Sequence, residues 1–136
     1  MNYLLDVNVL LAWGWADHAD HRRAATWIAE VRGRGEGQLL TSAIPELGFV
    51  RVSVQRTAGR LGVAEAVKTL ASMVRVLGDS HGFLTDDQSS AVPFPDWCQA
   101  ASRTTDAHLL DLARRHGATL ATLDTGIPGA FLVPVA

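Results

Sequence analysis

Short apolar segments recur along the chain, separated by longer segments whose apolar residues have helical spacing. The segments 3–5, 39–41 and 118–123 do not alternate apolar with polar residues, which is typical of strands buried on both faces. Helices between such strands indicate a parallel sheet with a helical layer on each side. We therefore predict an α/β fold, a three-layer α/β/α sandwich around a short, mostly parallel sheet.

Apolar periodicity, capping residues and glycine stops predict the remaining elements. Helices are expected over residues 9–15, 21–31, 64–77, 96–101 and 105–113, with one more after Ser42, and further strands over 82–85 and 131–135. The chain has 136 residues, 48% of them apolar, which is enough to bury a substantial core, and no repeat or linker divides it. We expect one domain over residues 1–136.

Composition excludes several classes of protein. No uninterrupted apolar run reaches the roughly 20 residues that cross a bilayer, so no membrane association is expected. The N-terminal apolar run lacks a basic segment and contains Asp6, unlike a signal peptide. The single cysteine, Cys98, cannot form a disulfide within the chain, and we expect a cytoplasmic protein.

Four acidic residues fall at or near the carboxyl ends of predicted strands. Asp6 follows the first strand directly, and Glu46 lies one turn into the helix after the second. Asp106 opens the helix that begins near residue 105, and Asp124 ends the last long apolar strand. Functional residues of doubly wound sheets gather beyond the carboxyl ends of the strands, so a parallel sheet would bring these acids to one edge.

Carboxylates gathered in one cleft repel each other and need a counter-charge. A divalent cation supplies it, and oxygen ligands without a Cys/His cluster favour Mg²⁺ or Mn²⁺ over zinc. Ordinary roles remain open: Asp106 as a helix-capping residue, Asp124 in an Asx-turn and Glu46 in a surface ion pair. Asp6 differs because its strand is apolar on both sides, and burying an unpaired carboxylate is costly.

The net charge of −2 does not exclude a nucleic-acid partner. The chain has 12 basic and 14 acidic residues, so setting four site acids aside leaves an excess of basic residues that attract phosphate. All but one of the basic residues are arginine, which binds phosphate in a bidentate manner. A codon bias of the source genome explains the same arginine excess.

Four segments in a fixed order carry a resemblance to a known family. They are Leu-Leu-Asp-Val-Asn-Val-Leu at 4–10, the segment 42–51, Thr-Thr-Asp-Ala-His-Leu at 104–109 and Ala-Thr-Leu-Ala-Thr-Leu-Asp at 118–124. Together they span nearly the whole chain, and they resemble PIN-domain ribonucleases, in particular the toxin half of VapBC toxin–antitoxin pairs. The resemblance implies metal-dependent endoribonuclease activity on RNA, often a tRNA or a ribosomal RNA loop.

The resemblance also implies roles for individual residues. Asp6, Glu46, Asp106 and Asp124 would be the acidic residues of the site, and Asn8 would help to order Asp6 or the metal-bound waters. Mg²⁺ or Mn²⁺ would be held mainly by Asp6 and Asp106, with Asp124 as a further metal ligand. Glu46 or Asp124 would orient the attacking water, either directly or through a second metal. The chain departs from many relatives two positions after Asp124, where Gly126 replaces an acid.

Candidate partners follow from basic and aromatic residues. Arg51, Arg56 and Arg103 are candidate phosphate contacts, with solvated surface arginine as the alternative for each. Trp13 and Trp15 make an early helix unusually apolar for a monomer surface, which indicates a homodimer. The resemblance likewise implies a dimer and a cognate antitoxin protein, a segment of which lies across the active-site groove.

Two other functions stay open. One is a phosphatase or receiver-like domain with Asp6 as phosphoryl acceptor, although Asn8 stands where a second acid is usual and Lys68 is the only lysine. The other is a PIN-fold binding module without catalysis. A mostly solvated loop is expected to contain Asp86, Asp87, Ser89 and Ser90. No metal site is expected at His81, His108 or His116.

Overall fold

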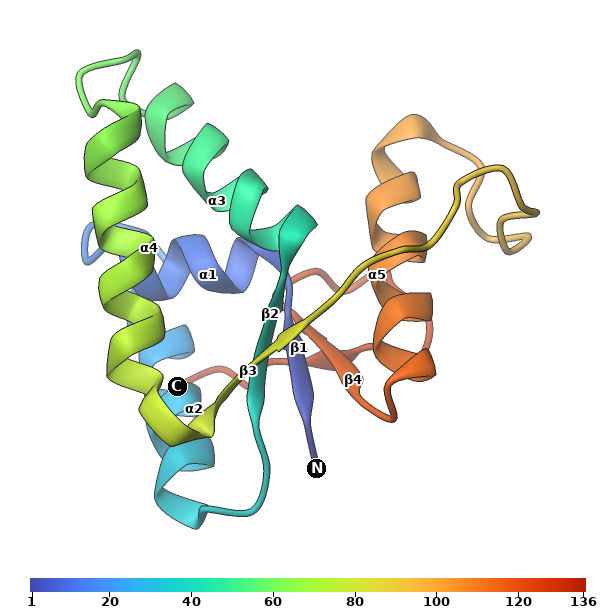
Figure 1. The fold of residues 1–136 in the computed structure, drawn as a ribbon, viewed down its shortest axis with the longest axis horizontal. Coiled ribbons are helices and arrows are strands. Elements are labelled where there is room, and N and C mark those ends of the chain that lie inside the picture. The colour runs from blue at the N-terminus through green and yellow to red at the C-terminus, as the bar shows by residue number, and fades with distance from the viewer.

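Five strands form the central sheet, in the spatial order β3-β2-β1-β4-β5 (Figure 1). The structure is a computed structural model that describes all 136 residues. The strands are β1 (Tyr3–Leu5), β2 (Leu39–Ser42), β3 (His81–Leu84), β4 (Thr119–Thr122) and β5 (Phe131–Leu132). Every neighbouring pair is parallel, with Leu4 opposite both Leu40 and Leu120. The predicted parallel sheet is confirmed.

Helices cover both faces of this sheet. They are α1 (Val7–Gly14), α2 (His21–Arg34), α3 (Ala43–Gln55), α4 (Val63–Leu77) and α5 (Thr104–Arg115), with short 3₁₀ turns η1 (Gly78–Ser80) and η2 (Ala101–Arg103). Leu5 packs into one apolar cluster with side chains of α1 to α4, and its neighbour Leu4 packs into a second cluster with α5. Successive side chains of a strand point to opposite faces, so β1 anchors both layers of the predicted sandwich.

Two predicted elements differ from the structure. Residues 96–101 are not a helix, and only η2 forms there, because this proline-flanked segment has no periodic apolar face to bury. The last strand ends at Leu132 rather than continuing to residue 135. Val133 still donates a hydrogen bond to the Thr122 carbonyl at 2.9 Å, but Pro134 has no N–H with which to continue the ladder.

The early tryptophans are largely accommodated within the chain. Trp15 donates from Nε1 to the Ser53 hydroxyl at 2.8 Å and stacks on Phe49 with ring centroids 5.8 Å apart. Trp27 is buried against Tyr3 in an edge-to-face contact. None of the helices combines the length and the apolar character needed to cross a bilayer.

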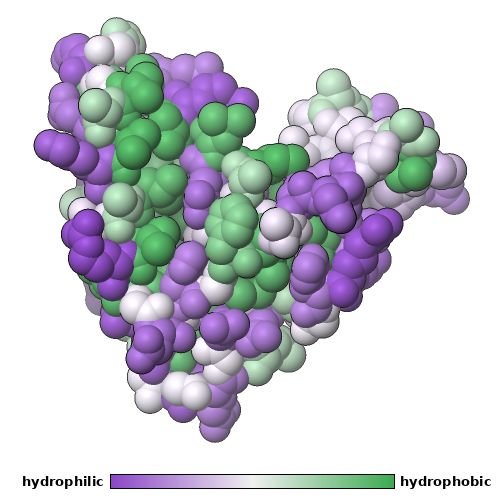
Figure 2. Space-filling model, in the orientation of Figure 1, coloured by the Kyte–Doolittle hydropathy of each residue, from purple (hydrophilic) through white to green (hydrophobic).

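A notch separates two lobes of the surface (Figure 2). Helices α3 and α4 form one lobe, while α5 and the segment that precedes it form the other (Figure 1). The chain runs along β1 and β2 toward this notch, so residues that follow the carboxyl ends of these strands lie near its base (Figure 1).

Candidate active site

Asp6 lies between the central strand and the first helix. It is the N-cap of α1, where Oδ1 accepts a hydrogen bond from the Val7 amide at 2.7 Å. Oδ2 accepts a second bond from the Thr122 hydroxyl at 2.8 Å. Only 5% of Asp6 is exposed, and this burial raises the pKa of its carboxyl although both hydrogen bonds favour the charged form. The carboxylate is therefore held in a fixed orientation at an energetic cost.

Thr122, at the end of β4, joins three polar groups around Asp6. Its hydroxyl oxygen accepts hydrogen bonds from Asn8 Nδ2 at 3.2 Å and from the Asp124 amide at 3.1 Å. Asn8 Oδ1 in turn accepts from the Leu123 amide at 3.1 Å. Asn8 thus ties the first turn of α1 to the carboxyl end of β4, and its contact with Asp6 runs through Thr122.

Asp106 and Asp124 share an electrostatic environment with Asp6. Burial raises the pKa of the Asp106 carboxyl first, and the negative charges of Asp6 and Asp124 raise it further. Asp124 is exposed and accepts the Gly126 amide on Oδ1 at 3.0 Å, so the predicted Asx-turn is present. The charges of these three acids therefore act on one another, and two of them, Asp6 and Asp124, follow the paired strands β1 and β4.

Glu46 occupies a different part of the notch, on the β3 side of the sheet. Its Oε2 accepts the Thr41 hydroxyl at 2.7 Å, and His81 Nε2 lies 2.8 Å from the same Thr41 oxygen. The hydroxyl has one hydrogen, which it gives to Glu46, so His81 must donate from Nε2. Burial lowers the pKa of His81, and the Glu46 charge opposes that shift.

The start of α3 approaches α1 closely because of a glycine. A Cβ at Gly48 would lie 2.8 Å from Cγ2 of Val7, the residue after Asp6. Only glycine leaves this space, so Gly48 brings the first turns of α3, including Glu46, near the N-terminus of α1. No charge effect of Glu46 on Asp6 or Asp106 is resolved, in contrast to that of Asp124.

Arg103 stands at the opposite border of the acid group. Its Nε lies 3.7 Å from Asp106 Oδ2, and its guanidinium lowers the pKa of that carboxyl. It also donates to the Gly126 carbonyl and lies over the Trp97 ring, 5.2 Å from the centroid. A Cβ at Gly126 would come within 2.8 Å of Arg103 Nη1. Gly126 is therefore packed against the guanidinium of Arg103.

The other two candidate phosphate contacts lie on α3 or at its end. Arg51 is exposed and has no ion pair or side-chain hydrogen bond. Arg56 is the C-cap of α3 and pairs with Asp17 at 3.2 Å. Of the three arginines, only Arg103 contacts a residue of the acid group.

The donor chemistry of this site fits a hard divalent cation. Carboxylate oxygens suit Mg²⁺ and Mn²⁺. Burial first, and then neighbouring acids, raise the pKa values of Asp6 and Asp106, and a cation held by these two carboxylates would offset the repulsion. No three His, Cys, Asp or Glu side chains lie close enough to hold a metal together. Mg²⁺ usually keeps several waters and binds through one or two carboxylates, so it does not require such a cage.

Nearly the whole chain matches a known family, since a model described as "PIN domain" matches residues 3–130. The chain belongs to the PIN-domain family.

Curated relatives of this PIN domain match over most of their length. It is 37% identical over 132 residues to Ribonuclease VapC39 of Mycobacterium tuberculosis, which covers 93% of this chain and 91% of the relative. It is 38% identical over 126 residues to Ribonuclease VapC38 of the same organism, covering 91% and 86%. A crystal structure of VapBC2 from Rickettsia felis bound to a promoter DNA fragment has a TM-score of 0.60 at 12% identity, covering 97% of both chains. That likeness supports the fold.

Sequence reasoning missed three contributors to the geometry of this PIN domain. Thr122 lies in a recognised segment, but its link to Asp6 joins residues 116 positions apart. Thr41 bridges Glu46 and His81 across two strands. Asp86, assigned to a mostly solvated loop, has a side chain that is only 6% exposed and pairs with His108 at 2.7 Å, so that assignment is corrected for Asp86. A polar residue at the end of each strand was the only sequence signal for Thr41 and Thr122.

Proposed function

We propose that this PIN domain is an endoribonuclease that hydrolyses phosphodiester bonds in RNA and acts as the toxin of a toxin–antitoxin pair. The observation that carries the proposal is the convergence of Asp6, Asp106 and Asp124 at one end of the sheet, where the charges of neighbouring acids add to burial in raising the pKa values of Asp6 and Asp106. Perturbed carboxyls gathered in a notch are characteristic of catalytic and metal sites. Relatives named ribonucleases, 37–38% identical over about nine-tenths of the chain, support the same activity.

In the proposed mechanism, Asp6 and Asp106 would hold one Mg²⁺ or Mn²⁺ ion, and Asp124 would act as a further oxygen ligand. A bound ion of this kind lowers the pKa of a coordinated water and compensates charge on the phosphate. Val7 and Thr122 keep the Asp6 oxygens oriented. Glu46, held by Thr41, would take the proton of the attacking water on a carboxylate oxygen. The P–O bond to the leaving ribose oxygen would break, and that oxygen would take up a proton from solvent. Arg103 contributes positive charge beside the phosphate.

Cleavage of RNA by the purified protein tests this function. Full-length protein is incubated with total RNA in Mg²⁺ or Mn²⁺, or in excess EDTA, and the cut sites are mapped. We expect discrete cuts, in tRNA or ribosomal RNA loops, that require the divalent ion. Undiminished cleavage in EDTA would exclude the metal-dependent mechanism, and no cleavage of any RNA would contradict the assignment.

A non-catalytic binding module is the second candidate. It is favoured by one observation, the absence of a group of three possible ligands at metal-holding distance. A Mn²⁺ titration separates the two functions, because a module should show little specific binding. The phosphatase alternative receives no support, since Lys68, the single lysine, lies on α4, which carries none of the four acids.

The proposed partners are a cognate antitoxin protein and a second copy of the chain. A VapBC complex among structures of the same fold supports an antitoxin. Large apolar side chains are exposed on α3 and α4, and apolar surface follows α4 in Figure 2. They are Leu47, Val63, Val67 and Val76. In the proposed homodimer, two copies of the chain associate through this face, and the dimer acts on cytoplasmic RNA. Val67→Glu should then reduce the dimer fraction in sedimentation equilibrium.

A further inference from the structure

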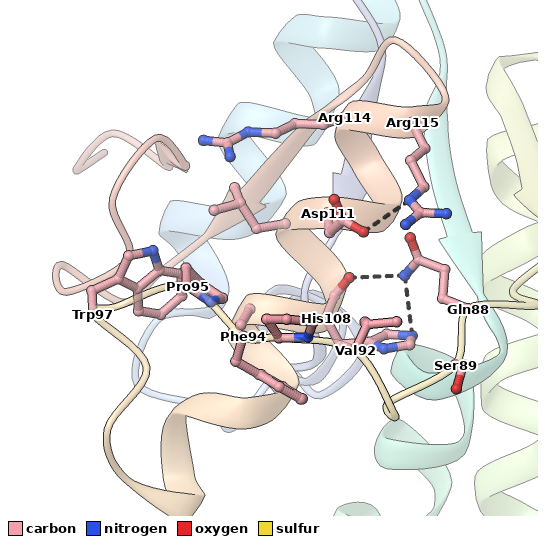
Figure 3. A pocket seen from close by; sticks show the side chains of 13 residues that line it. Gln88, Ser89, Val92, Phe94, Pro95, Trp97, His108, Asp111, Arg114 and Arg115 are labelled. Carbon is pink, nitrogen blue, oxygen red and sulfur yellow. Dashed lines mark hydrogen bonds and ion pairs between the residues drawn. The ribbon is translucent and has the colours of Figure 1, made fainter.

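A cavity of about 480 Å³ lies between α5 and the segment 88–97 (Figure 3). This volume is within the range of small-ligand sites. Trp97, Phe94 and Pro95 lie on one side, while Gln88, Ser89 and His108 lie on the other (Figure 3). The cavity is distinct from the acid group, since none of the four proposed catalytic acids lines it.

Flat aromatic surface is one part of its chemistry. Phe94 is 37% exposed, and Trp97 lines the cavity while its ring also carries the Arg103 guanidinium. Aromatic rings of this kind bind nucleobases by stacking. An apolar occupant alone would not explain the polar groups on the other walls.

Two unpartnered polar groups line the same cavity. Arg114 has no hydrogen bond or ion pair through its guanidinium, whereas its neighbour Arg115 pairs with Asp111 at 2.8 Å. The Oε1 atom of Gln88 is buried and has no hydrogen-bond partner. A free cation suits an anion, and a buried acceptor without a donor suits an N–H group of a ligand.

Hydrogen bonds hold the wall that presents Gln88. His108 Nε2 lies 2.7 Å from Asp86 Oδ2, and Gln88 Nε2 donates to the His108 carbonyl at 3.2 Å. These contacts bind the loop to α5 on one side of the cavity. A preformed wall of this kind reduces the ordering cost of binding.

Trp97 connects the cavity to the acid group. Arg103 lies over its ring at 5.2 Å and is 3.7 Å from Asp106. A chain of phosphates that follows these contacts would pass from Arg103 to Arg114. These contacts link the base-stacking wall of the cavity to the acid group through Arg103.

We propose that this cavity binds one nucleotide of the single-stranded RNA substrate, close to the nucleotide whose phosphate is cut. The inference rests on the proposed ribonuclease function. The base stacks on Phe94 and Trp97 and donates an N–H to Gln88, and its phosphate meets Arg114. This site fixes where along a single strand the cut falls.

Steady-state cleavage of a short single-stranded RNA tests the subsite. Phe94→Ala should raise KM about tenfold with kcat within twofold, because a base stack is worth about 1–3 kcal/mol. Arg114→Gln should raise KM and reduce the slope of log affinity against log salt by about 0.7, as expected for one lost phosphate contact. Arg115→Gln is the matched control, because Asp111 already neutralises that arginine, and its KM should stay within twofold.

A binding measurement separates this inference from the function on which it rests. The four 5′-mononucleotides, with inorganic phosphate as control, are titrated into the full-length Asp6→Asn protein and followed by amide NMR. We expect shifts over residues 88–97 and α5, lost in Phe94→Ala. Absence of such shifts, together with unchanged KM in both variants, would overturn the subsite even if RNA is cleaved. Loss of antitoxin binding alone in these variants would overturn it in favour of a protein contact.

Discussion

The Arg103 guanidinium lies 3.7 Å from the Asp106 carboxylate in a site where the neighbouring acids, Asp6 and Asp124, repel that carboxylate. The distance is too long for a hydrogen bond, so the attraction is electrostatic. Arg103 is held there by the Gly126 carbonyl and the Trp97 ring. A divalent cation bound to Asp106 would therefore be repelled by the guanidinium of Arg103.

Replacing this arginine should affect metal binding and RNA cleavage in opposite directions. In Arg103→Gln, Mn²⁺ affinity measured by calorimetry should rise about fivefold, because a hydrated unit charge about 4 Å away contributes roughly 1 kcal/mol. Cleavage at saturating Mn²⁺ should fall about tenfold if the same guanidinium meets the phosphate. Arg32→Gln, whose arginine donates to the Val76 carbonyl, is the control and should change neither quantity. A parallel loss of metal affinity and cleavage would contradict this role.

Gly126→Ala should weaken the same arrangement without unfolding the protein. The added Cβ would come within 2.8 Å of Arg103 Nη1, the end of a flexible side chain on an exposed turn. The guanidinium should move, so Mn²⁺ affinity should rise, by less than in Arg103→Gln. Calorimetry on both variants and on the double variant checks the common cause, since the double variant should match Arg103→Gln. Additive effects would indicate that Gly126 acts independently.

Thr41 should control the position of Glu46. Thr41→Val is nearly isosteric but removes the hydroxyl that joins His81 to Glu46, and Thr41 is 1% exposed. We expect kcat to fall about tenfold and the free energy of unfolding to fall by about 1–3 kcal/mol, the cost of unpaired buried groups. Thr41→Ser keeps the hydroxyl and should retain most of the kcat. Equal loss of kcat in the two variants would assign Thr41 to packing alone.

Asp106 should make metal-free stability depend on pH. Its folded pKa is above the ordinary value of 3.8, so the folded state binds more protons than the unfolded state between the two values. The contribution of Asp106 to the free energy of unfolding is therefore lost as pH rises through its folded pKa. In EDTA at pH 7, Asp106→Asn should melt at a higher temperature than the wild type, and the difference should vanish near pH 3.5. Excess Mg²⁺ should reverse the order at pH 7, because only the wild type keeps both main ligands.

The sequence was sufficient to predict the layers of the fold because burial dictates them. Segments such as Tyr3–Leu5, apolar at successive positions, must be covered on both faces, and this requirement implies a parallel sheet between helices. The same reasoning placed Asp6 and Asp124 at the carboxyl ends of two parallel strands, and the structure adds that these strands, β1 and β4, are direct neighbours.

The finer geometry depends on side chains that meet only after folding. Thr122 and Asp6 are 116 positions apart, and Asp86 reaches His108 from a loop without periodicity. The close contact between Gly126 and Arg103 likewise appears only in the folded chain. Such contacts leave no spacing signal in one sequence, because they depend on rotamers and loop paths rather than on apolar periodicity.

Substitution of Asp6 is the most direct test of the acid site as the catalytic centre. Asp6→Asn preserves size and the acceptor for the Val7 amide while removing the charge at the centre of the group. We predict that the purified, metal-loaded variant loses at least 100-fold in RNA cleavage, on the order of the loss when one catalytic group is removed, with an unchanged circular dichroism spectrum. Cleavage at the wild-type rate by the folded variant would contradict the account.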